Sequence, residues 1–192
     1  MKTFLTTLIA LGCGAALAAP STYKIDSDHT YPSFEADHMG GLSVWRGKFR
    51  KTEGTVELDA AAHSGSVDIT VDASTIDFGH EKMNEHAKSA EMFDTAKFPT
   101  ATYKGKFSKF KGKVPTEVTG ELTLHGVTKP VKLTIRSFSC RPPMAPMMPT
   151  EKCGADAVAS FNRADFGIDY GAKFHFNMMV KLAIQVEAAK TN

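Results

Sequence analysis

The feature that most constrains the fold of this chain is a strict alternation of apolar and polar residues near its C-terminal end. Between Phe174 and Glu187 every second residue is large and apolar, and most residues between them are polar. Side chains point to opposite faces at successive positions of a β-strand, so this period of two predicts a strand with one apolar face. At about 3.3 Å per residue such a strand would run roughly 40 Å, which predicts a tall sheet.

The same alternation recurs along the chain, with Gly, Pro or Asn/Asp residues punctuating most of the segments. It is clearest at 67–72, 101–107, 118–124 and 131–136, and further strands are expected at 33–38, 43–50, 54–59 and 157–162.

Two segments depart from this pattern. The stretch from His80 to Met92 lacks β-branched residues and is rich in Glu, Lys, Met and Ala, which predicts one short helix after Gly79. Arg141–Thr150 carries four prolines and three methionines, and therefore cannot be a regular strand. We expect it to be a hairpin loop.

Eight or nine amphipathic strands in one domain leave sheet edges that must be paired or covered. Closure into an antiparallel barrel and packing into a two-sheet sandwich are both solutions, but only a barrel of about eight strands has room for a small ligand. The apolar faces are rich in phenylalanine, with 13 Phe against 1 Trp in the chain. Glycines at 47, 105 and 120 fall on inward-facing positions, where they make space or bends. Both features favour an all-β barrel with one short helix.

The first 18 residues are typical of a cleaved signal peptide. Lys2 provides the positive start, residues 4–11 are apolar, and Ala16-Leu17-Ala18 forms an A-x-A cleavage site. We therefore expect cleavage after Ala18 and release into the periplasm, with a folded domain at 19–192. Lipid attachment at Cys13 is the alternative, and it is disfavoured because Ala10 stands where a leucine is usual.

Two cysteines remain after such cleavage, Cys140 and Cys153. An oxidising compartment and an even count predict a disulfide, which would close the proline-rich loop. A metal or redox pair is the alternative, but the C-x-x-C spacing and partner ligands are absent. The formal net charge of +2 is too small for the basic face that nucleic-acid binding requires.

No familiar catalytic or metal-binding motif is present in the sequence. His80-Glu81 begins like the zinc-protease helix motif H-E-x-x-H, but Asn84 occupies the second ligand position, so we expect no metal there. His29 and His38 are nine residues apart and would point to opposite faces of one strand; we expect each to bond to backbone or a carboxylate. The nucleophile elbow, the P-loop and the dinucleotide fingerprint are also absent.

Several separated motifs occur in order along the chain. They are the segments 23–26, 29–30, 34–38, 46–49, 84–86, 92–94, 98–100, 118–131 and 161–167. Together these motifs resemble the YceI-like family. Ala87 departs from the family pattern, which usually has a leucine there, and this change would loosen the packing of the helix.

The resemblance implies an eight-stranded antiparallel, lipocalin-like barrel that holds an isoprenoid, a quinone or a similar amphiphile, with no catalytic residues and no cofactor other than such a lipid. Arg163 is a candidate for the lipid head group, or alternatively for an ion pair with Asp165 or another acid. His38 and His86 are lesser candidates for the polar end. The side chains expected to face inward are Phe34, Trp45, Phe49, Phe107, Phe161, Phe174, Phe176, Met178 and Val180, although any one ring could simply fill the core.

Three functions remain open at this point. The first is a periplasmic lipid carrier that makes transient contact with a membrane or a membrane protein, its oligomeric state unspecified. The second is an enzyme or electron-transfer accessory acting on a bound quinone. The third is a stress-related protein with a filled core.

Overall fold

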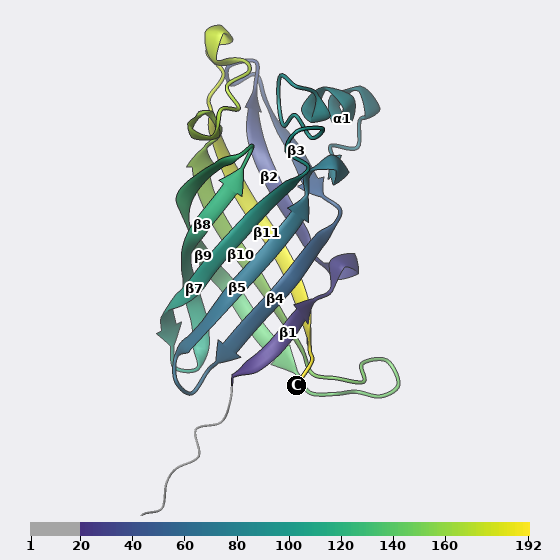
Figure 1. Ribbon diagram of the computed structural model, residues 1–192, viewed down its shortest axis with the longest axis vertical. Coiled ribbons are helices and arrows are strands. Elements are labelled where there is room, and N and C mark those ends of the chain that lie inside the picture. Colours follow the sequence, from purple (N-terminus) through teal and green to yellow (C-terminus); the bar gives the residue numbers. More distant parts are fainter. Residues whose placement is uncertain (1–19) are drawn as a thin grey trace, which may run out of the picture.

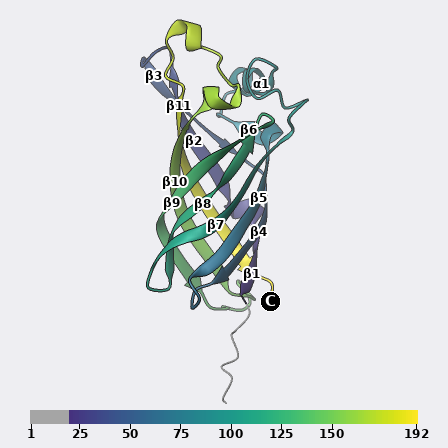
Figure 2. The ribbon, with the colours of Figure 1, turned by 60° about the vertical axis from the view of Figure 1, so that its left-hand side comes forward.

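The computed structural model describes residues 20–192, which form a tall, closed antiparallel barrel (Figure 1, Figure 2). The ring runs in the order β1-β4-β5-β7-β8-β9-β10-β11, and β11 pairs back to β1. The predicted eight-stranded barrel is therefore confirmed. The strands are β1 (Ser21–Ile25), β2 (Tyr31–His38), β3 (Ser43–Phe49), β4 (Thr52–Asp59), β5 (Ser64–Asp72), β6 (Ile76–Asp77), β7 (Thr100–Lys111), β8 (Val114–Leu124), β9 (Val127–Arg141), β10 (Lys152–Asn162) and β11 (Met179–Lys190).

Three members of the ring are interrupted partway up the barrel. Each of the three consists of two strands that follow each other in the chain. β1 and β2 both pair with β11, β3 and β4 are separated by two residues, and β6 follows β5 and pairs with β3. Hydroxyl groups replace the missing ladder bonds: Thr75 Oγ1 accepts from the backbone N–H groups of Arg50 and Lys51, and Thr30 Oγ1 bonds to both backbone groups of Glu187. β1 and β6 were not among the predicted strands because they are short.

The helix α1 (Glu81–Lys88) lies at the upper end of the barrel, between β6 and β7 in the chain (Figure 1). It begins after His80, whose Nδ1 accepts a hydrogen bond from the backbone of Met83. It ends four residues earlier than predicted, because Ser89 is extended and the backbone carbonyls of Lys88 and Ser89 accept bonds from the following loop. Ala87 is fully buried and packs in one cluster with Phe34, and the expected loosening of the helix there stays a prediction.

The longest predicted strand is wrong at its beginning. β11 starts only at Met179, because residues 172–174 form a 3₁₀ turn and both Gly171 and His175 adopt left-handed conformations. The ring of Phe176 folds back onto Gly171, where a side chain would clash with it. From Val180 onward the predicted alternation is confirmed, and the apolar face points inward.

The glycines on the inner face make space that aromatic rings occupy. Gly105 and Gly120 lie opposite each other in β7 and β8, and a Cβ on Gly120 would meet the ring of Tyr103 at 2.8 Å. A Cβ on Gly47 would meet the ring of Phe34 at 2.7 Å.

The lower end of the barrel carries the disulfide-closed loop. Cys140 and Cys153 are register partners in β9 and β10 and form the predicted bond, which confirms both the pairing and the hairpin loop. The expected signal peptide, 1–18, lies outside the described residues. Among the described helices, none has the length and hydropathy needed to cross a membrane.

Candidate functional site

The interior of the barrel contains two cavities, one above the other. The lower chamber has a volume of about 200 Å³ and the upper chamber about 370 Å³. Sites that hold small ligands typically offer about 300–1,000 Å³. Pro32, Val71, Leu122 and Leu182 line both chambers, so the two cavities meet at this ring, which we call the neck.

The lower chamber has an aliphatic wall built from the alternating residues of β4, β5, β8, β9 and β11. Two phenol groups near it already have partners: Tyr103 donates to the carbonyl of Val131 at 2.8 Å, and Tyr23 donates to Glu151 at 2.7 Å. Thr52, which also lines this chamber, differs, because its buried Oγ1 has no hydrogen-bond partner among the described residues. Burial raises the pKa of each phenol to about 12. Apart from Thr52 Oγ1, the wall of this chamber offers little to a polar group, and it suits hydrocarbon. Its apolar lining includes Val56, Val67, Ile69, Phe107, Leu133, Ile135, Ile184 and Val186.

The upper chamber is lined by aromatic rings and by a few polar groups. Phe34 packs between Phe49 and Phe78, with ring centroids 5.7 and 5.4 Å away. Trp45 and Phe176 flank His38, at 5.3 and 6.1 Å. These rings come from β2, β3 and the two long connections at the helix end, so the upper wall depends on loops as well as strands.

Arg163 is the cation in the wall of the upper chamber, and its side chain is only 8% exposed. It donates to the backbone carbonyls of Ile168 at 2.8 Å and Tyr170 at 2.7 Å, which holds the connection between β10 and β11 in place. The alternative, an ion pair with Asp165 or another acid, is not formed among the described residues. Burial lowers the pKa of Arg163, and the negative charges of Asp169 and Asp37 oppose that shift. Two carbonyl bonds leave further N–H donors on the guanidinium for a ligand.

Asp37, which the sequence analysis missed, ties together the two loops of the upper end. Its carboxylate accepts hydrogen bonds from the backbone N–H groups of Asn177 at 2.8 Å and Gly41 at 2.7 Å. These hydrogen bonds lower the pKa of Asp37, and the bond from Asn177 has the largest effect. The alternation of apolar and polar residues does not predict this role of Asp37, because the role depends on where the backbone of Asn177 lies.

Two histidines complete the polar part of the upper chamber. His86 on α1 packs edge-on against Tyr170 with centroids 4.7 Å apart, and its Nδ1 lies 3.9 Å from Glu91. His38 Nδ1 lies 3.4 Å from the hydroxyl of Ser43. Together with Arg163, Asp37 and Tyr170 they supply most of the hydrogen-bonding side chains of a cavity whose remaining lining is apolar or aromatic.

The structure brings most of the sequence-predicted ligand residues to the upper chamber. Phe107 lies instead in the lower chamber, and Met178 lines neither. Phe174 was predicted to face inward, and this is wrong: it is 68% exposed, because the chain turns at Gly171–His175 instead of running as a strand. The predicted ligand residues that line the upper chamber are Phe34, His38, Trp45, Phe49, His86, Phe161, Arg163, Phe176 and Val180.

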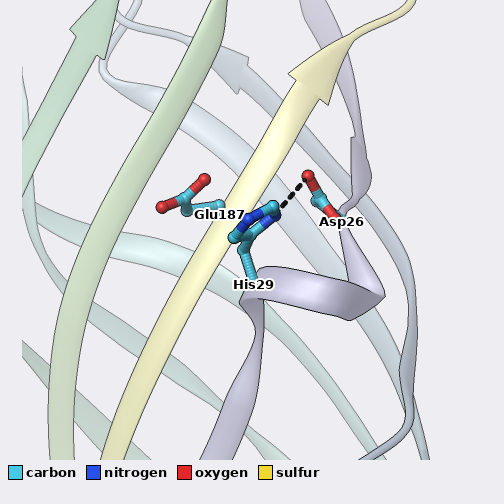
Figure 3. A group of neighbouring side chains, drawn as sticks. All are labelled: Asp26, His29 and Glu187. Carbon is cyan, nitrogen blue, oxygen red and sulfur yellow. Dashed lines mark hydrogen bonds and ion pairs between the residues drawn. The ribbon is translucent and has the colours of Figure 1, made fainter.

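Asp26, His29 and Glu187 lie together on the outer wall, with possible ligand atoms within 4.8 Å of one another (Figure 3). His29 Nδ1 is 2.9 Å from Asp26 Oδ2, and the ammonium group of Lys152 lies 2.7 Å from the same oxygen. The expectation that His29 pairs with a carboxylate is confirmed. Because a lysine already neutralises the carboxylate, this group is an ion-pair cluster that joins the Ser27–His29 turn to β10.

Comparison with known proteins gives consistent results. The model of the YceI-like domain matches residues 23–188. A UPF0312 protein of Azotobacter vinelandii is 35% identical over 127 residues, which is 66% of each chain. Protein YceI of Salmonella arizonae is 38% identical over 123 residues, 62% of each chain, so these matches span about two thirds of the relatives' length.

Solved structures show the same fold at low sequence identity. Burkholderia cenocepacia BcnA superimposes with a TM-score of 0.66 at 22% identity, covering 86% of this chain and 99% of BcnA. A polyisoprenoid-binding domain from Saccharophagus degradans, implicated in plant cell wall breakdown, gives 0.62 at 14% identity, covering 88% and 98%. On the family match and the shared barrel, this chain belongs to the YceI-like domain family.

Proposed function

We propose that this protein binds one long amphiphilic lipid, such as an isoprenoid or a quinone, and does not act on it chemically. The observation that carries the proposal is the pair of stacked chambers, apolar below and polar-edged above. Each buried methylene of a tail contributes about 0.8 kcal/mol before ordering costs, so a tail that fills both chambers can bind well without specific contacts.

The chemistry of the two chambers sets the orientation of the ligand. A polar group buried without a hydrogen-bond partner is costly, and the hydroxyl groups of Tyr23 and Tyr103 are already bonded. The tail therefore occupies the lower chamber, and the head lies in the upper chamber near Arg163 and His86. A guanidinium group suits an anionic or carbonyl-bearing head.

Two internal chambers disfavour the alternative of a filled core. For the quinone-modifying alternative, the histidines and the arginine that line the upper chamber are His38, His86 and Arg163. Substituting them would change turnover but not occupancy if that alternative were correct, whereas head-group binding predicts a change in occupancy.

We expect the lipid to enter at the upper end of the barrel, between the two loops above the upper chamber. Met39, Leu42 and Phe174 are 57%, 77% and 68% exposed on the two loops above the upper chamber. The loops touch, since a Cβ on Gly40 would lie 3.4 Å from the carbonyl oxygen of His175. Large apolar side chains at adjoining loop tips suit transient contact with a bilayer surface. The disulfide supports a periplasmic, oxidising location.

The test measures affinity against tail length. Trp45, the single tryptophan, lines the upper chamber and reports on occupancy by its fluorescence. We expect the affinity for a series of isoprenols of increasing length to rise by about fourfold per buried methylene and then to level off when both chambers are full.

A matched pair of variants makes the test specific. Leu182→Trp places a large ring in the neck, whereas Ala183→Trp adds the same ring on the outer face of β11. The first should abolish the gain from tails longer than the upper chamber, and the second should behave like the parent. An affinity independent of tail length, or equal behaviour of the two variants, would overturn the proposal. So would solvent extracts of purified protein that repeatedly contain no lipid.

A further inference from the structure

The loop closed by the disulfide is rich in methionine, and its methionines line neither chamber. It contains three of the nine methionines of the chain, Met144, Met147 and Met148, within five residues. It projects from the lower end of the barrel, opposite α1 (Figure 1). Met144 is 56% and Met147 82% exposed, so these two thioethers contribute little to packing.

The backbone of the loop brings two of these side chains together. The backbone N–H of Met144 donates to the carbonyl of Met148 at 2.7 Å, and that of Met148 donates back at 2.8 Å. Directly opposed residues of an antiparallel pair project their side chains to the same face, with Cα atoms about 5.5 Å apart. Methionine has a flexible, unbranched side chain, so two thioether sulfurs on one face can reach a common point.

Met147 stands next to this pair, inside the three-residue turn that joins Met144 to Met148. The Cys140–Cys153 disulfide fixes the base of the loop. A loop that is already closed loses less conformational entropy when three of its side chains converge on one ion.

The donor set selects the kind of ion. Residues 142–150 contain no carboxylate, imidazole or thiolate, and Glu151 at the end of the loop is bonded to Tyr23. Neutral thioethers are soft ligands that favour Cu(I), whereas oxygen ligands suit Mg²⁺ and Ca²⁺. We propose that Met144, Met147 and Met148 form a surface site for a soft monovalent cation, Cu(I), at the end of the barrel opposite the lipid head group. Binding is ligand exchange at sulfur, with no change in oxidation state.

The test uses the full chain and two probes. Ag(I), a soft monovalent ion that is stable in air, is titrated while the methyl groups of ¹³C-labelled methionine are followed by NMR. Cu(I) is then titrated anaerobically against a chromophoric chelator. We expect one ion per chain, shifts confined to the methyl resonances of Met144, Met147 and Met148, and no competition from Zn²⁺.

Variants separate this site from general soft-metal binding. Replacing all three residues (Met144→Leu, Met147→Leu and Met148→Leu) keeps their volume but removes the sulfurs, and should abolish binding while leaving the response of Trp45 to isoprenols unchanged. Met39→Leu removes an exposed methionine at the other end of the barrel and should leave Cu(I) binding intact. Binding that survives the triple substitution, for example at Asp26, His29 and Glu187, would overturn the proposal. The same holds if the parent shows no Cu(I) binding.

Discussion

The two ends of this barrel are built by different means. At the lower end the ring is continuous, every neighbouring strand is paired, and a disulfide joins β9 to β10. At the upper end three strands are interrupted, and the wall is completed by α1 and by the connection between β10 and β11. The regular end encloses an aliphatic chamber, whereas the irregular end carries the charged and aromatic groups. The irregular segments therefore place Arg163 and His86 at the cavity, beside Asp37 and His38 of β2.

Of the substitutions that test this difference between the two ends, we expect the one at Arg163 to lower the stability most. Arg163→Met removes two charge-assisted hydrogen bonds and leaves the carbonyls of Ile168 and Tyr170 without these donors. We expect a loss of about 4 kcal/mol in the free energy of unfolding, measured by urea titration. Hydrogen exchange should accelerate most in residues 163–171.

Arg46→Met is the matched control, because Arg46 is exposed and pairs with Glu35 on the outer surface. Its loss should cost about 0.5 kcal/mol or less. If the two arginine variants are equally stable, the upper wall does not depend on Arg163 in the way described.

The disulfide provides the next largest effect, at the opposite end. Cys140→Ser combined with Cys153→Ser removes a cross-link between residues 13 apart in sequence. The chain-entropy model gives a loss of about 3 kcal/mol, which acts through the unfolded chain. Thermal unfolding should show a lower midpoint, and a reductant should lower the midpoint of the parent but not of the variant. A parent insensitive to reduction would show that the cross-link adds nothing to the stability of the lower end.

The regular end is also the part that the sequence predicts best. Alternation over 67–72, 118–124 and 131–136 identifies strands and their inward faces, because period two has only one structural meaning. The need to pair sheet edges allows both a barrel and a sandwich, and the Phe-rich faces and inward glycines favour the closed ring. Most aliphatic residues of these faces line the lower chamber, whereas most of the phenylalanines expected to face inward line the upper one.

The irregular end could not be predicted in the same way. Phe174 and Phe176 continue the alternation of β11, but Gly171 and His175 turn the chain, so only Phe176 reaches the cavity. The partners of Arg163 are backbone carbonyls of a loop that folds back through Gly167, which has a left-handed conformation. Contacts of this kind depend on the path of the loop, and residue type alone does not reveal them.

A substitution at Tyr103, with a smaller expected effect on stability, tests whether the lower chamber offers a polar contact to the ligand. Tyr103→Phe removes the hydroxyl that donates to Val131 and should cost about 1 kcal/mol of stability. The affinity for an isoprenol should not change, because this hydroxyl is already bonded within the wall. Tyr170→Phe, at the upper end, is the counterpart and should change stability by less than about 0.5 kcal/mol. A weaker isoprenol affinity in Tyr103→Phe would mean that the lower chamber also offers a polar contact.

The smallest expected effect is a pH dependence at the cluster of Asp26, His29 and Lys152 on the outer wall. The hydrogen bond from Lys152 lowers the pKa of Asp26, so the stabilisation from this carboxylate is present above its ordinary value of 3.8 and is lost as the pH falls through the lowered value. The hydrogen bond to Asp26 raises the pKa of His29, so that contribution is full below the ordinary value of 6.5 and is lost as the pH rises through the raised value. The cluster therefore stabilises most between these two ordinary values. Asp26→Asn should lower the unfolding midpoint most in that window and return the pKa of His29, followed by NMR, toward 6.5. A His29 pKa that does not respond to Asp26→Asn would show that the contact in Figure 3 carries no charge coupling, and that the Ser27–His29 turn is held to β10 by packing and backbone bonds alone.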